Sequence, residues 1–226
     1  MKYSAIIFDL DGTIVDSEPI WERATVCLLA SKGITVDQTS EKKLRKELHG
    51  IGIIKSAEVL INFFNLKETS QELISEQNTL VKKFYEQEIK FIDGFLDFHK
   101  KLGAFNLKKG IATNADYHTL KISRTKFGLD KFFGNHIYCA EDVNNISKPE
   151  PDLYLHAAKK LEVEPAVCVA IEDSMFGIHA AKKAGMFCIG INTSGKRQSL
   201  QDADMIVNNY QEIELDAFFK KQNITG

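Results

Sequence analysis

Two aspartates separated by one residue, Asp9 and Asp11, stand near the N-terminus in the segment DLDGT, residues 9–13. The four apolar residues before them, 5–8, predict a buried β-strand, so the acidic segment is expected at the C-terminal end of that strand. Parallel sheets bind ligands at this edge. Neighbouring carboxylates repel each other unless they are solvated, bound to a cation or separated in pKa for acid–base work. The alternative is an ordinary Asp-Gly turn.

A second acidic pair, Glu172 and Asp173, follows the strongest apolar run of the chain, residues 167–171. Adjacent acids at the end of a buried strand are costly unless a cation lies nearby. Hard oxygen ligands of this kind select Mg²⁺, which usually keeps several waters. Together with Asp9 and Asp11, four acids would face one Mg²⁺ and one lysine, and a phosphate oxygen could complete the coordination of the metal.

Two further polar segments stand where the same sheet edge is expected. Thr113 and Asn114 offer a hydroxyl and backbone N–H groups at a helix N-terminus, which suits an anion, although both residue types are also ordinary helix caps. In the segment SKPEPD, residues 147–152, two prolines fix the backbone around Lys148 and prepare the entry to a helix. A rigid backbone suits a lysine whose charge must be directed at one place. The alternative is that Lys148 is a solvated loop lysine.

Alternating strand and helix patterns in the second half of the chain position these segments. Short apolar runs predict strands at residues 110–113, 137–140, 167–171, 187–191 and 205–207. Between them, helical patterns cover residues 116–127, 151–161 and 175–184. Such alternation implies right-handed βαβ crossovers and an α/β fold with a doubly wound parallel sheet. All the strand ends then face one crevice, and four polar segments that each follow a strand are more specific than any one motif.

A long helical block interrupts this pattern directly after the first strand. Helices are expected over residues 19–33, 44–48, 54–64 and 70–89. Pro19 suits the start of the first of them, and Thr69 with Glu72 has the capping-box pattern at the start of the last. No strand signal interrupts the block, so a helical insertion of about half-domain size is expected here.

Composition limits the function classes that fit. The 226 residues are 44% hydrophobic and 27% charged, which is ordinary for a chain that buries a sizeable core. A formal net charge of −2 gives no electrostatic footprint for nucleic acid or an anionic membrane. The four cysteines form no CxxC pair, which argues against a zinc site or a disulfide framework. With no apolar run of membrane-spanning length and no room for a signal peptide before the first strand, a cytoplasmic protein is expected.

Taken together, the four polar segments resemble the motifs of the haloacid dehalogenase-like (HAD) superfamily. The segments that resemble its first, second, third and fourth motifs are, in that order, DLDGT at 9–13, Thr113-Asn114, Lys148-Pro149 and Glu172-Asp173-Ser174. The resemblance spans nearly the whole chain. Within the superfamily it is nearest to the branch of sugar-phosphate phosphatases and β-phosphoglucomutase, because true dehalogenases are expected to lack the second acid that Asp11 supplies.

The resemblance also implies a domain organisation. The fold would be a HAD-like Rossmannoid core, with a doubly wound parallel sheet, and a small α-helical cap inserted after the first strand. Residues 1–15 and 92–226 would form the core, and residues 16–91 would form the cap.

Residues and resemblance together indicate phosphoryl transfer through a covalent intermediate. Asp9 would attack phosphorus to form an aspartyl phosphate, while Asp11 would protonate the leaving oxygen and then deprotonate the attacking water. The non-bridging phosphate oxygens would be held by Thr113, Asn114 and Lys148. The ligands of Mg²⁺ would be Asp9, the Asp11 backbone carbonyl, Asp173 and, directly or through water, Glu172.

We therefore expect a Mg²⁺-dependent phosphatase, acting as a monomer, that hydrolyses small phosphomonoesters such as hexose 6-phosphates. The second interpretation is a β-phosphoglucomutase-like phosphosugar mutase, and the third is a non-catalytic relative that binds a phosphorylated ligand. Such mutases carry a histidine and an arginine in the cap where this chain aligns Trp21 and Ile53. Trp21 could stack on a sugar or pack in the cap core. His49 could reach the substrate or lie in a surface turn.

Overall fold

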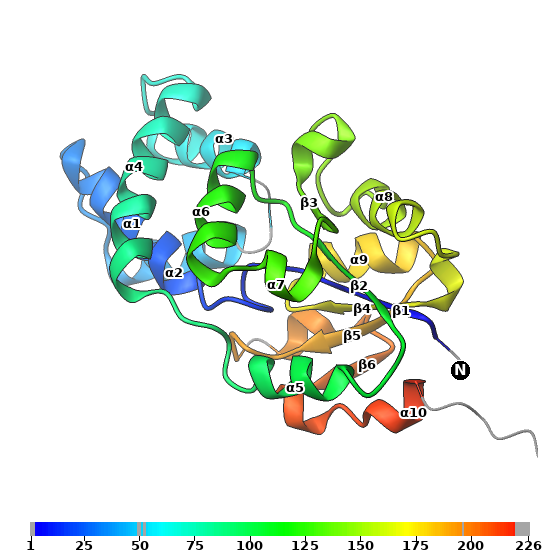
Figure 1. Ribbon diagram of the computed structural model, residues 1–226. Coiled ribbons are helices and arrows are strands. Elements are labelled where there is room, and N and C mark those ends of the chain that lie inside the picture. Colours follow the sequence, from blue (N-terminus) through cyan, green and yellow to red (C-terminus); the bar gives the residue numbers. More distant parts are fainter. Residues whose placement is uncertain (1–2, 49–50, 52, 196, 220–226) are drawn as a thin grey trace, which may run out of the picture.

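A six-stranded parallel sheet lies at the centre of the computed structural model, which describes residues 3–48, 51, 53–195 and 197–219 (Figure 1). Its strand order is β3-β2-β1-β4-β5-β6. The strands are β1 (Ala5–Phe8), β2 (Lys108–Ala112), β3 (Ile137–Tyr138), β4 (Cys168–Glu172), β5 (Phe187–Ile191) and β6 (Met205–Val207). The order runs outward from β1 in both directions, which confirms the doubly wound arrangement that the sequence predicts.

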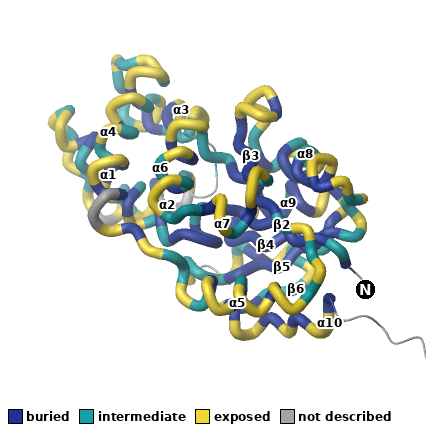
Figure 2. The backbone as a smooth tube through the Cα atoms, viewed as in Figure 1, coloured by how far each residue is buried: buried dark blue, intermediate teal, exposed yellow. Residues whose placement is uncertain are grey.

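Helices cover both faces of the sheet because its strands are apolar on both sides. In β1, Ile6 and Phe8 pack into one apolar cluster, and Ala5 and Ile7 pack into another. Residues of α5 (Phe95–Leu102), α6 (Tyr117–Phe127), α7 (Asp130–Phe133) and α10 (Leu215–Phe219) join the first cluster. Residues of α8 (Asp152–Lys160) and α9 (Met175–Lys183) join the second. The strands are accordingly buried along most of their length (Figure 2).

Four helices between β1 and α5 form a separate layer beside the sheet (Figure 1). They are α1 (Glu18–Ser31), α2 (Gln38–Leu48), α3 (Ile53–Phe64) and α4 (Ser70–Glu88). A third apolar cluster lies among them, formed by Leu28, Leu29, Leu44, Ala57, Leu60 and Leu73. We call these four helices the cap. Their own cluster supports the expected division of the chain at residues 16–91, which stays a prediction.

The predicted elements agree with the structure in kind and differ at some ends. The capping box at Thr69 is present at the start of α4. The helix expected at 44–48 begins earlier, at Gln38, and the strand expected at 137–140 ends at Tyr138, where a 3₁₀ helix, Ala140–Val143, takes over. Among the described residues, no helix is long and apolar enough to cross a membrane.

Candidate active site

Three neighbouring strands bring the acidic and hydroxyl segments to one edge of the sheet. In the strand register, Phe8 of β1 lies between Ile111 of β2 and Ile171 of β4. Asp9 therefore follows directly beside Glu172, and its backbone N–H donates to the Ile171 carbonyl at 3.0 Å. The ends of parallel strands are where such sheets bind ligands.

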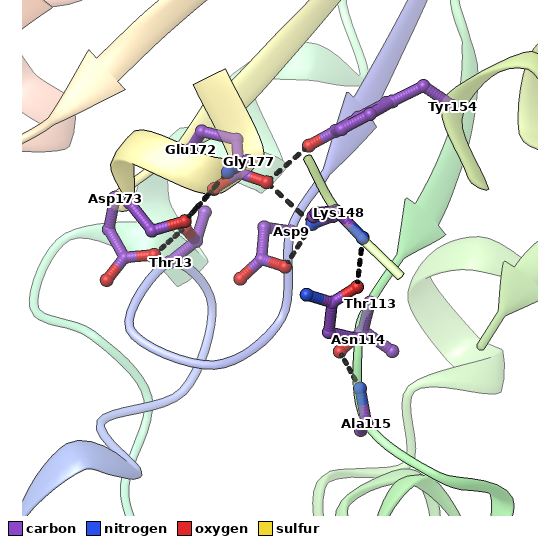
Figure 3. A network of polar contacts seen from close by, with 11 residues as sticks. Asp9, Thr13, Thr113, Asn114, Ala115, Lys148, Tyr154, Glu172, Asp173 and Gly177 are labelled. Carbon is purple, nitrogen blue, oxygen red and sulfur yellow. Dashed lines mark hydrogen bonds and ion pairs between the residues drawn. The ribbon is translucent and has the colours of Figure 1, made fainter. Parts of the chain in front are cut away.

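Lys148 is buried between two of these acids. Its Nζ lies 2.6 Å from Asp9 Oδ1 and 2.6 Å from Glu172 Oε1, and its side chain is 2% exposed (Figure 3). Burial alone lowers the pKa of Lys148, but the carboxylates of Asp9 and Glu172 raise it above its ordinary value. The lysine is thus a fixed cation, and the alternative of a solvated loop lysine is wrong.

Glu172 is held from several sides and is fully buried. The Tyr154 hydroxyl donates to its Oε1 at 2.7 Å, and the Ser174 hydroxyl donates to its Oε2 at 3.2 Å. Ser174 in turn caps α9 by accepting from the Gly177 N–H at 3.1 Å. A carboxylate bound this tightly has a fixed orientation, so Glu172 positions Lys148 as well as adding charge.

Asp173 faces the turn that follows β1. The Thr13 hydroxyl lies 3.4 Å from Asp173 Oδ1. Gly12 has a φ of +82°, and a Cβ at this residue would lie 2.2 Å from Asp173 Oδ2. Gly12 is therefore required both by its left-handed backbone and by the close approach of the acid. The Asp-Gly turn that the sequence offered as the alternative is present, and it packs against Asp173.

The acidic cluster fits a divalent cation. Asp9, Glu172 and Asp173 each offer a carboxylate oxygen, and these three oxygens lie within 4.8 Å of one another. Ionised, they leave two negative charges that Lys148 does not neutralise. Burial raises the pKa of Asp9 despite the neighbouring ammonium of Lys148, so its charged form needs further compensation. Buried oxygen ligands with this charge are the set that Mg²⁺ prefers.

Asp11 is oriented differently from Asp9. Its Oδ1 accepts from the Ser17 hydroxyl at 2.5 Å and from the Tyr85 hydroxyl at 3.1 Å. Burial raises the pKa of Asp11, although these two donors act against the shift. Asp11 therefore keeps its proton to a higher pH than an exposed aspartate, as a general acid requires.

Thr113 and Asn114 line the same cavity as the acids and do not cap a helix. The cap of α6 is Asp116, which accepts from the Thr119 N–H, so the alternative that assigned this role to Thr113 and Asn114 is wrong. Asn114 Oδ1 accepts from the Lys148 backbone N–H at 2.9 Å, and the Thr113 hydroxyl accepts from the Ala115 N–H at 3.1 Å. Asn114 thereby fixes the loop that carries Lys148.

A cavity of about 200 Å³ extends from these residues into the cap. Asp9, Asp11, Thr113, Lys148 and Asp173 line its core end. Its cap end is mostly apolar, with lining residues that include Trp21, Val26, Leu29, Leu44, Leu48 and Ile53. Trp21 contacts both the cavity and the main apolar cluster, so the two interpretations of this residue are compatible. His49 lies outside the described residues.

Sequence reasoning missed the hydroxyl donors that orient the acids. Tyr154 lies in a predicted helix and reads as one of its apolar residues, and nothing in the sequence marks Tyr85 within α4. Ser17 precedes α1 as an ordinary helix cap would. Its hydroxyl makes no cap hydrogen bond because it donates to Asp11.

Comparisons with known proteins identify the family and several relatives of this chain. A family model described as haloacid dehalogenase-like hydrolase matches residues 6–191. β-Phosphoglucomutase of Bacillus subtilis (strain 168) is 32% identical over 223 residues, which are 94% of this chain and 92% of that protein. Hexitol phosphatase B of Escherichia coli (strain K12) is 32% identical over 184 residues, 80% of each chain. The crystal structure of β-phosphoglucomutase from Clostridium difficile has a TM-score of 0.81, with 26% identity and coverage of 95% of both chains.

Proposed function

This chain belongs to the haloacid dehalogenase-like hydrolase family, and from that membership we propose that it is a Mg²⁺-dependent phosphatase acting on small sugar phosphates. The observation that carries the proposal is the buried contact of 2.6 Å between Asp9 and Lys148 on the cavity wall. It sets a carboxylate that can attack phosphorus beside an ammonium that can neutralise phosphate oxygens.

Asp9, Asp173, Glu172 and the backbone carbonyl of Asp11 are the groups that would hold Mg²⁺. When bound, the ion supplies positive charge that stabilises the phosphoryl oxygens in the transition state. The three buried carboxylates supply the hard oxygen ligands that such an ion needs.

In the first half of the reaction, an oxygen of Asp9 forms a bond to phosphorus while the bond between phosphorus and the leaving oxygen breaks. Asp11 gives its proton to that oxygen and so releases an alcohol. The raised pKa of Asp11 supports this role. Thr113 and Asn114 line the same cavity and can donate to the non-bridging oxygens beside Lys148.

In the second half, a water molecule attacks phosphorus and Asp11 accepts its proton. The bond between phosphorus and the Asp9 oxygen breaks, which releases inorganic phosphate and restores both carboxyl groups. Each cycle therefore consumes one ester and one water and yields one alcohol and one phosphate.

A phosphosugar mutase is the second candidate, and the similarity to β-phosphoglucomutase favours it. A mutase returns the phosphoryl group to another hydroxyl of the sugar and releases no net phosphate. Trp21 and Ile53, which line the cavity, stand where the mutases are expected to carry a histidine and an arginine. Two apolar side chains there favour the phosphatase, because a second phosphate group on the substrate requires a cationic or hydrogen-bonding partner.

Phosphate release with Mg²⁺ from hexose, hexitol, pentose and two-carbon phosphomonoesters tests the proposal. We expect one phosphate per ester consumed by the wild type, and turnover reduced by about 10³-fold or more in Asp9→Asn, which lacks the nucleophile. The matched control is Asp97→Asn, an exposed acid on α5 that should retain wild-type turnover. Wild-type turnover in Asp9→Asn would show the nucleophile to be misassigned, and isomerised ester without free phosphate would indicate the mutase.

A further inference from the structure

The cap end of the cavity contains buried polar groups among its apolar side chains. Thr25 of α1 and Gln77 of α4 line it from the cap, and Thr119 of α6 lines it from the core. All three side chains are more than nine-tenths buried. Polar groups in such a place are normally paired within the protein.

The orientation of the Gln77 amide is fixed by Thr25. Gln77 Nε2 donates to Thr25 Oγ1 at 2.9 Å. The Thr25 hydroxyl gives its one proton to the Trp21 carbonyl at 2.8 Å, so it can only accept from Gln77. The NH₂ group of Gln77 is therefore directed to α1, and Oε1 is the atom left to interact elsewhere.

Gln77 Oε1 has no hydrogen-bond partner among the described residues, and the same is true of Thr119 Oγ1. An unpaired buried acceptor is unfavourable, so a bound molecule that satisfies it gains affinity. An amide oxygen can only accept, whereas a threonine hydroxyl can donate or accept. A ligand hydroxyl fits Gln77 because it can donate to the amide oxygen, and Thr119 offers a second unpaired hydroxyl on the wall of the same cavity.

We propose that Gln77, held by Thr25, is a specificity-determining residue that accepts a hydrogen bond from a hydroxyl on the alcohol part of the substrate. Apolar side chains of the cap that line the same cavity, among them Trp21, Leu29 and Leu44, can contact the carbon atoms of the same group. The preferred substrate class is thus a phosphomonoester whose alcohol part carries a hydroxyl that reaches Gln77 in the cap. This inference rests on the proposed phosphatase function.

Phosphate release by the wild type and Gln77→Leu tests it, with p-nitrophenyl phosphate, glucose 6-phosphate and the 2-, 3- and 4-deoxy analogues of glucose 6-phosphate. For the wild type, we expect kcat/KM to fall by about 5- to 100-fold for the analogue that lacks the recognised hydroxyl. Gln77→Leu should lose this discrimination, so that its kcat/KM values for glucose 6-phosphate and for that analogue agree within about threefold, while p-nitrophenyl phosphate, which has no such hydroxyl, reports whether the variant still turns over. Circular dichroism and thermal melting check that the variant is folded.

Two variants sharpen the test. Thr25→Val removes the group that orients the amide, so it should reduce discrimination through a higher KM, with kcat little changed. Asn78→Leu makes the same type of change at the next position of α4, whose side chain does not line the cavity, and should keep the wild-type discrimination. Equal discrimination by Gln77→Leu and the wild type would overturn the inference while leaving the phosphatase assignment intact.

Failure of the proposed function gives a different result. No phosphate release by the wild type from any of these esters would overturn the phosphatase, and calorimetric binding of glucose 6-phosphate would then decide the role of Gln77. Weaker binding by Gln77→Leu than by the wild type supports the inference. Equal binding contradicts it.

Discussion

Asp9 and Asp11 share a turn but have different surroundings. Asp9 lies against the ammonium of Lys148, while Asp11 accepts from the neutral hydroxyls of Ser17 and Tyr85. Neutral donors stabilise a carboxylate less than a cation does. A buried carboxyl with such partners is suited to holding and releasing a proton, which is the division of roles that the sequence predicts for the pair.

The raised pKa of Asp11 predicts how stability depends on pH. Between the ordinary pKa of an aspartate and the raised folded value, the folded protein binds a proton that the unfolded chain has lost, so ionising Asp11 destabilises the fold as pH rises. Asparagine never ionises. We therefore expect the free energy of unfolding of Asp11→Asn, relative to the wild type, to increase with pH through this window and then level off. Urea unfolding from pH 4.5 to 8 in EDTA measures it.

Asp130→Asn is the control for this experiment. Asp130 is exposed, and its hydrogen bond to Arg124 lowers its pKa, so its contribution is fully present above the ordinary pKa of an aspartate. The difference between this variant and the wild type should be constant from pH 5 to 8. A constant difference for Asp11→Asn as well would contradict the raised pKa of Asp11.

The positions of several candidate site residues could be predicted from the sequence because strand ends in a parallel sheet converge. Asp9, Thr113 and Glu172 needed only their place after apolar runs. The hydroxyls of Tyr85 and Tyr154 could not be predicted, because a tyrosine on a helix looks the same whether its ring fills the core or its hydroxyl binds an acid. Their roles depend on how helices dock on the sheet, which short-range patterns do not specify.

At the scale of elements, α9 begins close to the end of β4. A Cβ on Gly177 would lie 1.9 Å from the Glu172 carboxyl group, so only a glycine lets the first turn of the helix approach it. This approach lets Ser174 cap the helix and donate to Glu172 at the same time. A single structural unit is therefore formed by Glu172, Ser174 and Gly177.

Gly177→Ala should destabilise the protein, although alanine in a helix normally adds about 1 kcal/mol of stability over glycine. The added methyl group must displace Glu172 or tilt α9, at an expected cost of about 1–3 kcal/mol in urea unfolding. Because Glu172 holds Lys148, phosphate release should also fall.

The control is Gly185→Ala, just beyond the other end of α9. Gly185 has a φ of +80° and no heavy atom within 4 Å of an added Cβ, so its variant should lose a similar amount of stability through backbone strain alone. Its turnover should be that of the wild type. Full activity in Gly177→Ala would show that the contact with Glu172 does not matter for catalysis.

The ends of elements were harder to predict than their existence. β5 and β6 have the bounds that their apolar runs predict. The helix at Gln38 begins in a polar segment, QTSEKK, where no apolar periodicity marks it. The third strand is shorter than its apolar run because Ala140 already belongs to a 3₁₀ helix. Apolar patterns report burial, and burial continues beyond the hydrogen-bonded part of a strand.

For the whole molecule, the acidic cluster predicts that a divalent cation stabilises the fold. Mg²⁺ at about a hundred times its dissociation constant should raise the free energy of unfolding of the wild type by about 2.7 kcal/mol, since it binds the folded state. Asp173→Asn removes one of the three clustered carboxylates and should lose most of this gain. Urea unfolding with Mg²⁺ and with EDTA measures both.

Asp202→Asn, an exposed acid paired with His179, serves as the control and should gain as much from Mg²⁺ as the wild type. EDTA should also abolish phosphate release by the wild type, and Mg²⁺ should restore it. The same gain in Asp173→Asn as in the wild type would place the ion elsewhere.

The architecture of the whole molecule was within reach of sequence analysis, because strand–helix alternation and one helical insertion leave few topologies. The doubly wound parallel sheet and the family are confirmed. The contacts inside the cap could not be predicted from the sequence. Thr25 and Gln77 are separated by 51 intervening residues, and only the packing of α1 against α4 shows that they meet.

One helix reaches both ends of the cavity. Gln77 and Tyr85 are eight residues apart on α4, just over two turns, so they project from the same side of the helix about 12 Å apart along its axis. Gln77 lines the cap end of the cavity, and the Tyr85 hydroxyl donates a hydrogen bond to the carboxyl group of Asp11. Because both residues belong to one continuous helix, a tilt of α4 that moved Gln77 toward a ligand would also move the tyrosine hydroxyl that contacts the proton donor, and would so couple recognition of the alcohol to its protonation.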